Sequence, residues 1–283
     1  MKKLLITVLF FFLNVPVFAH HEAIFGPYSA MVSQVRTYVG TQMQTRQIGT
    51  AGERTQESTM FLSGGITPFK DIPLSFNLSL PISQIQGLDD GSSQRGLEDV
   101  ILGSSYAYEI KPLQKALGGL NNLIMGMVSV ELPTGSIDHA AMSGPVDYMA
   151  AGLMNFEWRQ FGATLYSFNR LHGTSGANTR KGNAYFLGGG FTYTPWRGSR
   201  GSQFLSLQMG YSYEIYMTNT DAGIQDLQSG GQQFLLHPTI VWGPGESLQL
   251  FTVVSLPLYR NFNSAAEQDR WRYGLGINYL LGG

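Results

Sequence analysis

Residues 74–82 read Leu-Ser-Phe-Asn-Leu-Ser-Leu-Pro-Ile, an almost unbroken alternation of apolar and polar side chains. A β-strand turns successive side chains to opposite faces, so Phe76 and Leu78 share one face while Asn77 lies on the other. Similar stretches recur along the whole chain. Many such segments behind an export signal predict a transmembrane β-barrel, in which the apolar face contacts lipid and the polar face lines a wet lumen.

The N-terminus has the features of a secretory signal peptide. Lys2 and Lys3 give it a positive start, a short apolar run follows, and residues 17–19 read Val-Phe-Ala, a small-residue cleavage site. The apolar run is shorter than the roughly 20 residues that a membrane-spanning helix needs, which argues against an uncleaved anchor. We therefore expect a signal peptide over residues 1–19 and a single barrel domain over residues 20–283.

The composition agrees with a membrane barrel. Charged residues make up 13% of the chain, about half of the share in soluble domains, whereas a soluble β-sandwich would carry more surface charge. The chain has 0 Cys, so no disulfide stabilises it despite the export signal, and barrel closure would do so by pairing every strand. The formal net charge of -1 points to neither nucleic acid nor an anionic surface as a partner.

About twelve segments have strand-like patterns, each long enough to cross a bilayer at the usual tilt. They lie near residues 31–44, 55–67, 72–84, 97–110, 122–132, 147–158, 161–171, 183–195, 203–217, 232–242, 247–260 and 270–281. Bacterial barrels alternate short periplasmic turns with longer external loops. The even-numbered connections here are mostly short and the odd-numbered ones long and polar. Connection 110–121 is the exception, and residues 112–117 within it could form one helical turn.

Aromatic residues gather towards the ends of these segments, as Trp158, Trp196, Trp242 and Trp271 illustrate. Outer-membrane barrels carry such girdles at the two interfaces between water and lipid. Aromatic residues also favour strands in general, so the girdle is weaker evidence than the loop lengths. Together the patterns predict an all-β fold, an antiparallel up-and-down transmembrane barrel of about twelve strands in the bacterial outer membrane.

If the apolar faces contact lipid, the opposite faces bring charged side chains into the lumen. The lumen-lining candidates are Arg36, Asp99, Glu131, Glu214, His237 and Arg272. The first and last strands must pair to close the barrel, so Arg36 and Arg272 are expected on one wall. A buried acid needs a partner, so we expect Glu214 to contact an Arg, His or Gln side chain. Such charges either set the selectivity of a pore or only brace the lumen, and the sequence leaves both open.

Other chemistry has little support in the sequence. His20 and His21 would begin the mature chain, where a free amine beside imidazoles can bind Cu or Zn, but we expect incidental histidines and no cofactor. A lipid hydrolase would need Ser, His and an Asn or Asp close together. The later histidines are His139, His172 and His237, and no Gly-x-Ser-x-Gly motif accompanies them. We therefore expect no enzyme.

Three stretches of the chain are distinctive: Val-Ser-Val-Glu-Leu-Pro-Thr-Gly at 128–135, Leu-Gly-Gly-Gly-Phe-Thr-Tyr at 187–193, and Trp-Arg-Tyr-Gly-Leu-Gly-Ile-Asn-Tyr at 271–279. They resemble an outer-membrane family associated with the meta-cleavage pathway of phenol degradation. The resemblance implies a transporter-like barrel for small compounds, aromatic ones among them, and it supplies no site residues. The chain departs from the usual aromatic C-terminal residue of outer-membrane proteins, since residues 280–283 read Leu-Leu-Gly-Gly.

The sequence thus predicts an outer-membrane channel or transporter barrel for a small solute, with an aromatic compound as one candidate. A structural or metal-handling barrel without conduction is the first alternative, and an interfacial lipid hydrolase is the second. The expected partners are outer-membrane lipid and the solute, with no nucleic acid. The pattern names neither the solute, nor the direction of transport, nor an oligomeric state.

Overall fold

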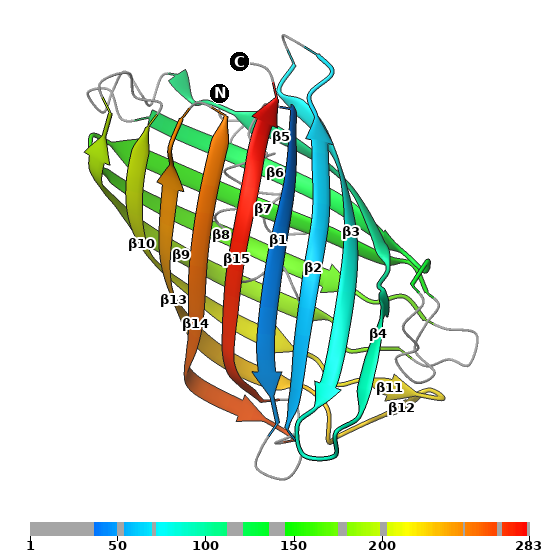
Figure 1. Ribbon diagram of the computed structural model, residues 1–283. Helices are drawn as coiled ribbons and strands as arrows, with labels where there is room; N and C mark the ends of the chain where they lie inside the picture. Colours follow the sequence, from blue (N-terminus) through cyan, green and yellow to red (C-terminus); the bar gives the residue numbers. More distant parts are fainter. Residues whose placement is uncertain are drawn as a thin grey trace.

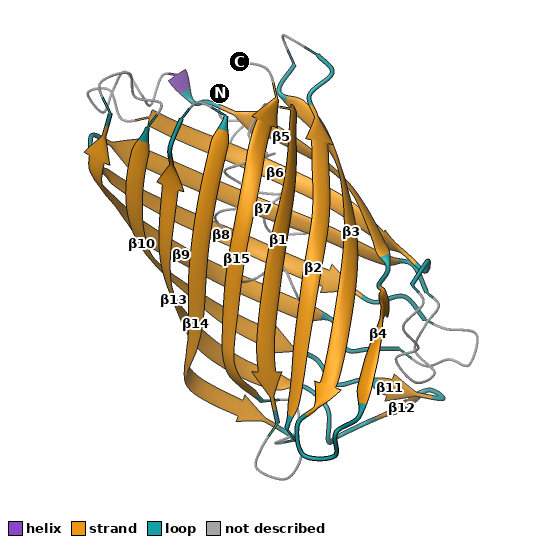
Figure 2. Ribbon diagram, in the orientation of Figure 1, coloured by secondary structure: helices purple, strands orange, loops and turns teal. Residues whose placement is uncertain are grey.

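A computed structural model shows the chain as a closed antiparallel β-barrel of 12 wall strands (Figure 1). The structure describes residues 37–49, 54–69, 72–111, 121–135, 145–174, 180–198, 203–245, 247–264 and 268–281. Strands dominate these residues (Figure 2), and no helix among them is long and apolar enough to span a membrane. The predicted all-β fold and strand number are confirmed.

The wall consists of long strands joined in chain order. They are β1 (Thr37–Ile48), β2 (Thr55–Ile66), β3 (Leu74–Gly87), β4 (Ser93–Leu97), β5 (Val100–Tyr108), β6 (Asn121–Leu132), β7 (Asp147–Trp158), β8 (Phe161–Leu171), β9 (Ala184–Arg197), β10 (Phe204–Tyr216), β13 (Gly231–Gly243), β14 (Leu248–Phe262) and β15 (Asp269–Leu281). Strands β4 and β5 both pair with β3, so they form one wall strand with a break between them. A separate small hairpin pairs β11 (Thr220–Asp221) with β12 (Ile224–Gln225).

Pairing of β1 with β15 closes the barrel, with Thr37 opposite Leu281 and Arg46 opposite Arg272. Strand β1 begins and β15 ends at one end of the barrel, the upper end in Figure 1, which we call the terminal end. The β11–β12 hairpin lies at the opposite end, which we call the loop end. The odd-numbered connections reach the loop end, as the loop-length pattern predicts for the external side of a bacterial barrel.

The side chains of the wall alternate between an exposed outer face and a buried inner face. In β3, Phe76 and Leu78 are 44% and 43% exposed, whereas Ser75 is 3% exposed. In β10, Leu207 and Met209 are exposed while Ser206 and Glu214 are buried. The outer face is therefore apolar along the strands and the inner face largely polar, which is the pattern that lipid outside and water inside require.

Some inner-face aromatic rings lie against glycines of the next strand. A Cβ added to Gly276 would overlap the ring of Phe251, and one added to Gly188 would overlap the ring of Tyr166. These two glycines are required because only a residue without a side chain lets a ring lie this close to the neighbouring backbone. The rings thus lie along the wall instead of standing across the lumen.

Several predicted boundaries differ from the structure. The first strand, expected at residues 31–44, is described from Thr37 to Ile48 and so reaches four residues further towards the loop end. The expected external loop at 218–230 contains the β11–β12 hairpin, because the chain there pairs with itself. The predicted helical turn at 112–117 and the signal peptide at 1–19 lie outside the described residues, so both stay predictions.

Candidate functional site

The inner wall holds four of the predicted lumen-lining residues. Glu131, Glu214, His237 and Arg272 lie on the inner faces of β6, β10, β13 and β15. Arg36 lies outside the described residues. Because β1 extends further than expected, it is Arg46 that pairs in register with Arg272.

Asp99 is placed differently from the other candidates. It lies at the break between β4 and β5, and its Oδ1 accepts hydrogen bonds from the backbone N–H groups of Thr134 and Gly135 at 2.9 and 2.7 Å. The Thr134 hydroxyl in turn accepts from the N–H of Val100 at 3.0 Å. Asp99 therefore stabilises the turn that follows β6, because its carboxylate accepts two hydrogen bonds from the backbone of that turn.

A network around Arg272 occupies the inner wall near the loop end. Its guanidinium donates to Glu214 through Nη1–Oε1 at 2.9 Å and Nη2–Oε2 at 2.7 Å, and through Nε to Asp269 Oδ2 at 3.1 Å. The amide of Gln233 donates to both carboxylates, at 2.7 and 2.6 Å, and the Tyr216 hydroxyl donates to Glu214 at 2.7 Å. We call these five residues the Arg272 cluster.

The Arg272 cluster follows from the cost of burying charge. Arg272 and Glu214 are fully buried, and an ion removed from water needs an opposite charge and hydrogen bonds to replace its hydration. The next strands extend the arrangement, because Arg46 Nε donates to Glu57 Oε2 at 2.9 Å across β1 and β2. Glu214 thus contacts an Arg and a Gln side chain, which are among the partners that the sequence predicts.

A second ionic network, the Arg170 cluster, consists of Arg170, Glu131, Asp147 and His172. Arg170 Nε donates to Asp147 Oδ2 at 2.9 Å, and its Nη2 forms an ion pair with Glu131. His172, just beyond β8, contacts Asp147 Oδ2 through Nδ1 at 2.6 Å. Burial lowers the pKa of His172 to about 4, the nearby Asp147 only partly opposing this, so the imidazole is neutral at pH 7 and Nδ1–H donates to the carboxylate.

Both clusters lie near the loop end of the barrel. Asp147 and Asp269 are the first residues of β7 and β15, and Arg170 is the last residue but one of β8. Aromatic rings pack beside the clusters: Phe186 contacts Phe168 edge-on at 5.9 Å between centroids, and it contacts Tyr216 of the Arg272 cluster edge-on at 5.7 Å. The loop end of the inner wall therefore combines paired charges with aromatic packing.

His237 connects the Arg272 cluster to the middle of the wall. Its Nε2 lies 2.8 Å from the Ser212 hydroxyl and its Nδ1 lies 2.8 Å from the Ser255 hydroxyl, so both ring nitrogens are engaged. Ser212 also lies 3.1 Å from Glu214 Oε1. A continuous chain of hydrogen bonds thus runs from Ser255 through His237 and Ser212 to Glu214.

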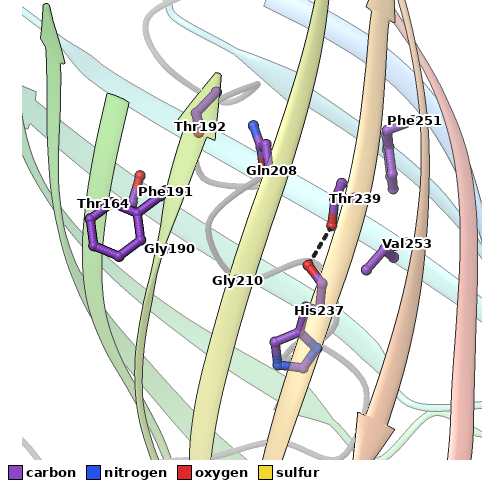
Figure 3. A pocket seen from close by; sticks show the side chains of 10 residues that line it. All are labelled: Thr164, Gly190, Phe191, Thr192, Gln208, Gly210, His237, Thr239, Phe251 and Val253. Carbon is purple, nitrogen blue, oxygen red and sulfur yellow. Dashed lines mark hydrogen bonds between the residues drawn. The ribbon is translucent and has the colours of Figure 1, made fainter. Parts of the chain in front are cut away.

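A small recess in the wall, which we call the niche, lies beside His237 (Figure 3). It is lined by Thr164, Gly190, Phe191, Thr192, Gln208, Gly210, His237, Thr239, Phe251 and Val253, which come from β8, β9, β10, β13 and β14. Its free volume is about 20 Å³, the space of about one water molecule. None of these side chains is an Asp, Glu, Lys or Arg, so the niche has no formal charge, and most of its lining surface is apolar with a few polar groups.

Sequence reasoning missed Arg46, Glu57, Asp147, Arg170 and Asp269 as members of the ionic networks. A usable signal existed for Arg46, since it continues the alternation of Gln42 and Gln44 on one face. The others stand at strand ends, where charged residues are also ordinary in loops. The niche had no local signal, because five strands contribute to it.

No candidate metal site is found in the described part of the chain. No group of three or more His, Cys, Asp or Glu side chains there could hold a metal ion. His20 and His21 lie outside that part, so metal binding by them stays a hypothesis. His237 has two serine partners, and no carboxylate of the described residues is hydrogen-bonded to its ring.

No family model matches the chain, and no curated protein matches it. Among solved structures, it is similar to the COG4313 outer membrane channel from Pseudomonas putida F1, with a TM-score of 0.68 and 13% identity over 87% of this chain and 96% of that chain. The KdgM porin (TM-score 0.46, 12% identity, 87% of this chain and 99% of that chain) and the NanC porin (TM-score 0.47, 8% identity, 87% and 100%) are more distant. At these identities the first likeness shows the fold alone, that of an outer-membrane barrel, and the two porins add nothing to it.

Proposed function

We propose that this protein is an outer-membrane channel that lets a small solute cross the barrel along its inner wall. The observation that carries the proposal is the contrast between the two faces of one closed sheet, apolar outside and polar inside. A barrel without a solute path would gain nothing from hydrogen-bonding groups on its inner face beyond those that brace it. Insertion into the bacterial outer membrane is part of this proposal and is supported by the fold.

The ionic clusters support a path for solutes of little charge. Each arginine of the two clusters is paired with two carboxylates, so neither arginine presents an uncompensated positive charge to the lumen, and the acids outnumber the cation in both clusters. Charges paired in this way tolerate polar neutral solutes, and the excess of carboxylates disfavours anions. The clusters then brace the loop end while the solute passes between them.

We extend the proposal to an aromatic solute, which is what the resemblance to the phenol-degradation family implies. Membership in that family is part of the same proposal. The inner wall contains the aromatic rings of Phe251 and Tyr166, which lie along the wall and are largely buried, beside hydrogen-bonding side chains. Ring compounds gain from contact with aromatic side chains as well as from hydrogen bonds, so a wall with both suits them.

Planar-bilayer conductance of the purified protein tests the channel. We expect discrete conductance that falls when Thr239→Trp places a bulky ring on the inner face. The matched variant Thr252→Trp, on the outer face of the neighbouring strand, should conduct like the parent. Uptake of a labelled aromatic solute into vesicles tests the solute class. No conductance from a protein that shows heat-modifiable mobility would favour the structural barrel, and turnover of a labelled phospholipid would favour the hydrolase.

A further inference from the structure

The niche presents hydrogen-bonding groups that have no partner among the described residues. Among the residues that the structure describes, the side chains of Gln208 and Thr192 form no hydrogen bond, although both border the niche. They come from neighbouring strands, where Gln208 pairs with Thr192 across β10 and β9. Figure 3 shows both side chains at the same side of the recess. A free amide and a free hydroxyl therefore face a space of one water molecule.

The other polar groups of the niche are already engaged. His237 uses both ring nitrogens on serines, Thr239 donates to the His237 carbonyl at 3.2 Å, and Thr164 donates to Asn155 Oδ1 at 2.9 Å. Thr164 and Thr239 keep oxygen lone pairs that can accept. A guest in the niche would therefore meet the amide of Gln208 as donor or acceptor and hydroxyl oxygens as acceptors.

Two glycines make room for the guest. Gly190 and Gly210 lie opposite each other in register, so the wall has no side chain at this point. A Cβ on Gly210 would come within 3.3 Å of the His237 Cβ, and one on Gly190 within 3.0 Å of the Gly210 Cα. Phe251 and Val253 border the same recess with apolar surface. The recess is thus polar on the side of β9 and β10 and apolar on the side of β14.

We propose that the niche seats a hydroxyl group of an uncharged ring-shaped solute, in place of one water, while the ring contacts Phe251 and Val253. A hydroxyl has the size of a water and can both donate and accept, which matches the free groups. An ion is disfavoured because no opposite charge lines the niche to replace its hydration. Hydroxylated aromatic compounds and sugars share this chemistry. The inference rests on the proposed channel function and names the chemistry of its solute.

Ligand-detected NMR on the purified barrel tests the niche with three probes: phenol, D-glucose and fluorobenzene. Fluorobenzene matches phenol in size but lacks the hydroxyl. We expect phenol to bind about 3–10-fold more tightly than fluorobenzene, the range of one net hydrogen bond. Binding of glucose would identify the sugar as the source of the hydroxyl instead. Equal binding of phenol and fluorobenzene together with no binding of glucose would overturn the proposal.

Variants locate the binding. Gln208→Met and Thr192→Val remove the free groups with little change of shape, and each should weaken the hydroxylated probe about 3–10-fold. Thr252→Val, on the outer face, is the matched control and should bind like the parent. Heat-modifiable mobility shows that each variant folds, and having two separate variants keeps the test decisive if one does not. Unchanged binding in both folded variants would place the probe elsewhere and refute the niche.

The two proposals fail in different ways. Conductance in bilayers without any preference for a hydroxyl would leave the channel standing and remove the niche as its solute contact. Hydroxyl-dependent binding in a barrel that never conducts would refute the channel proposal, and the bound molecule could then not be a transported solute. Conductance that phenol or glucose reduces in the parent but not in Gln208→Met would support both.

Discussion

Replacing Arg272 by Met tests whether the Arg272 cluster holds the loop end of the barrel together. The substitution removes the guanidinium that donates to both oxygens of Glu214 and to Asp269, while it keeps an apolar chain of similar length. It leaves two carboxylates without their cation on a wall where Glu214 is fully buried. Breaking a buried ion pair costs about 3–5 kcal/mol. Gln233 still donates to both acids, so we expect a loss within this range and not twice as much.

The assay is urea unfolding of the barrel in lipid vesicles, followed by tryptophan fluorescence and by the heat-modifiable band. Arg270→Met is the matched control, because Arg270 is an exposed neighbour for which no contact among the described residues is found, and it should change stability by less than about 0.5 kcal/mol. Adding Glu214→Gln to Arg272→Met should recover part of the loss, since one uncompensated charge disappears. A loss below about 1 kcal/mol for Arg272→Met, or no recovery in the double variant, would refute the reasoning.

Three further expectations follow from the same wall. Leu78→Arg puts a charge on the lipid face and should cost about 2–4 kcal/mol near the membrane midplane, whereas Asn77→Arg on the inner face should cost less in the same urea assay; equal costs would mean a wrong register. Glu214→Gln should alter ion selectivity or solute flux in bilayers more than stability, since Asp269 still balances Arg272; an unchanged current would leave bracing as the better account of the cluster. Unfolded His172 takes up a proton below about pH 6.5 but the buried ring does so only near pH 4, so stability should decline as the pH falls through this window, and His172→Gln should abolish that part of the decline.

The sequence predicts the barrel well because its strongest signal is local. Phe76, Leu78 and Ser75 differ in polarity at neighbouring positions, and the membrane requires that difference to persist along every wall strand. The position of Glu214 in the two-residue alternation of its strand, which we call its parity, therefore assigns it to the inner face without knowledge of its neighbours. The same rule placed Leu207 and Met209 outside, as the structure has them.

The parts of the candidate site that escaped prediction depend on information that parity lacks. Arg46 lies beyond the predicted end of the first strand at residue 44, whereas the strand continues to Ile48, so its pairing with Glu57 could not be predicted. Asp99 has the right parity for the lumen, but it lies at a break in its strand. There its carboxylate accepts hydrogen bonds from the backbone N–H groups of Thr134 and Gly135, in the turn that follows β6. At strand ends and breaks the alternation no longer predicts which face a side chain lies on, and several of the charged residues of the two clusters lie there.

The niche depends on the register between neighbouring strands, which the alternation within a single strand does not fix. Gly190 lies opposite Gly210, and Gln208 opposite Thr192, in the register that β9 and β10 adopt after a shift between Leu205 and Leu207. A register moved by two residues would keep every side chain on its own face, and so satisfy the alternation, yet it would separate the two glycines and close the recess. Inner-wall chemistry is therefore set by strand pairing, whereas membrane insertion is set by parity. A variant that shifts this register should keep the outer face and heat-modifiable folding but lose hydroxyl-dependent binding at the niche.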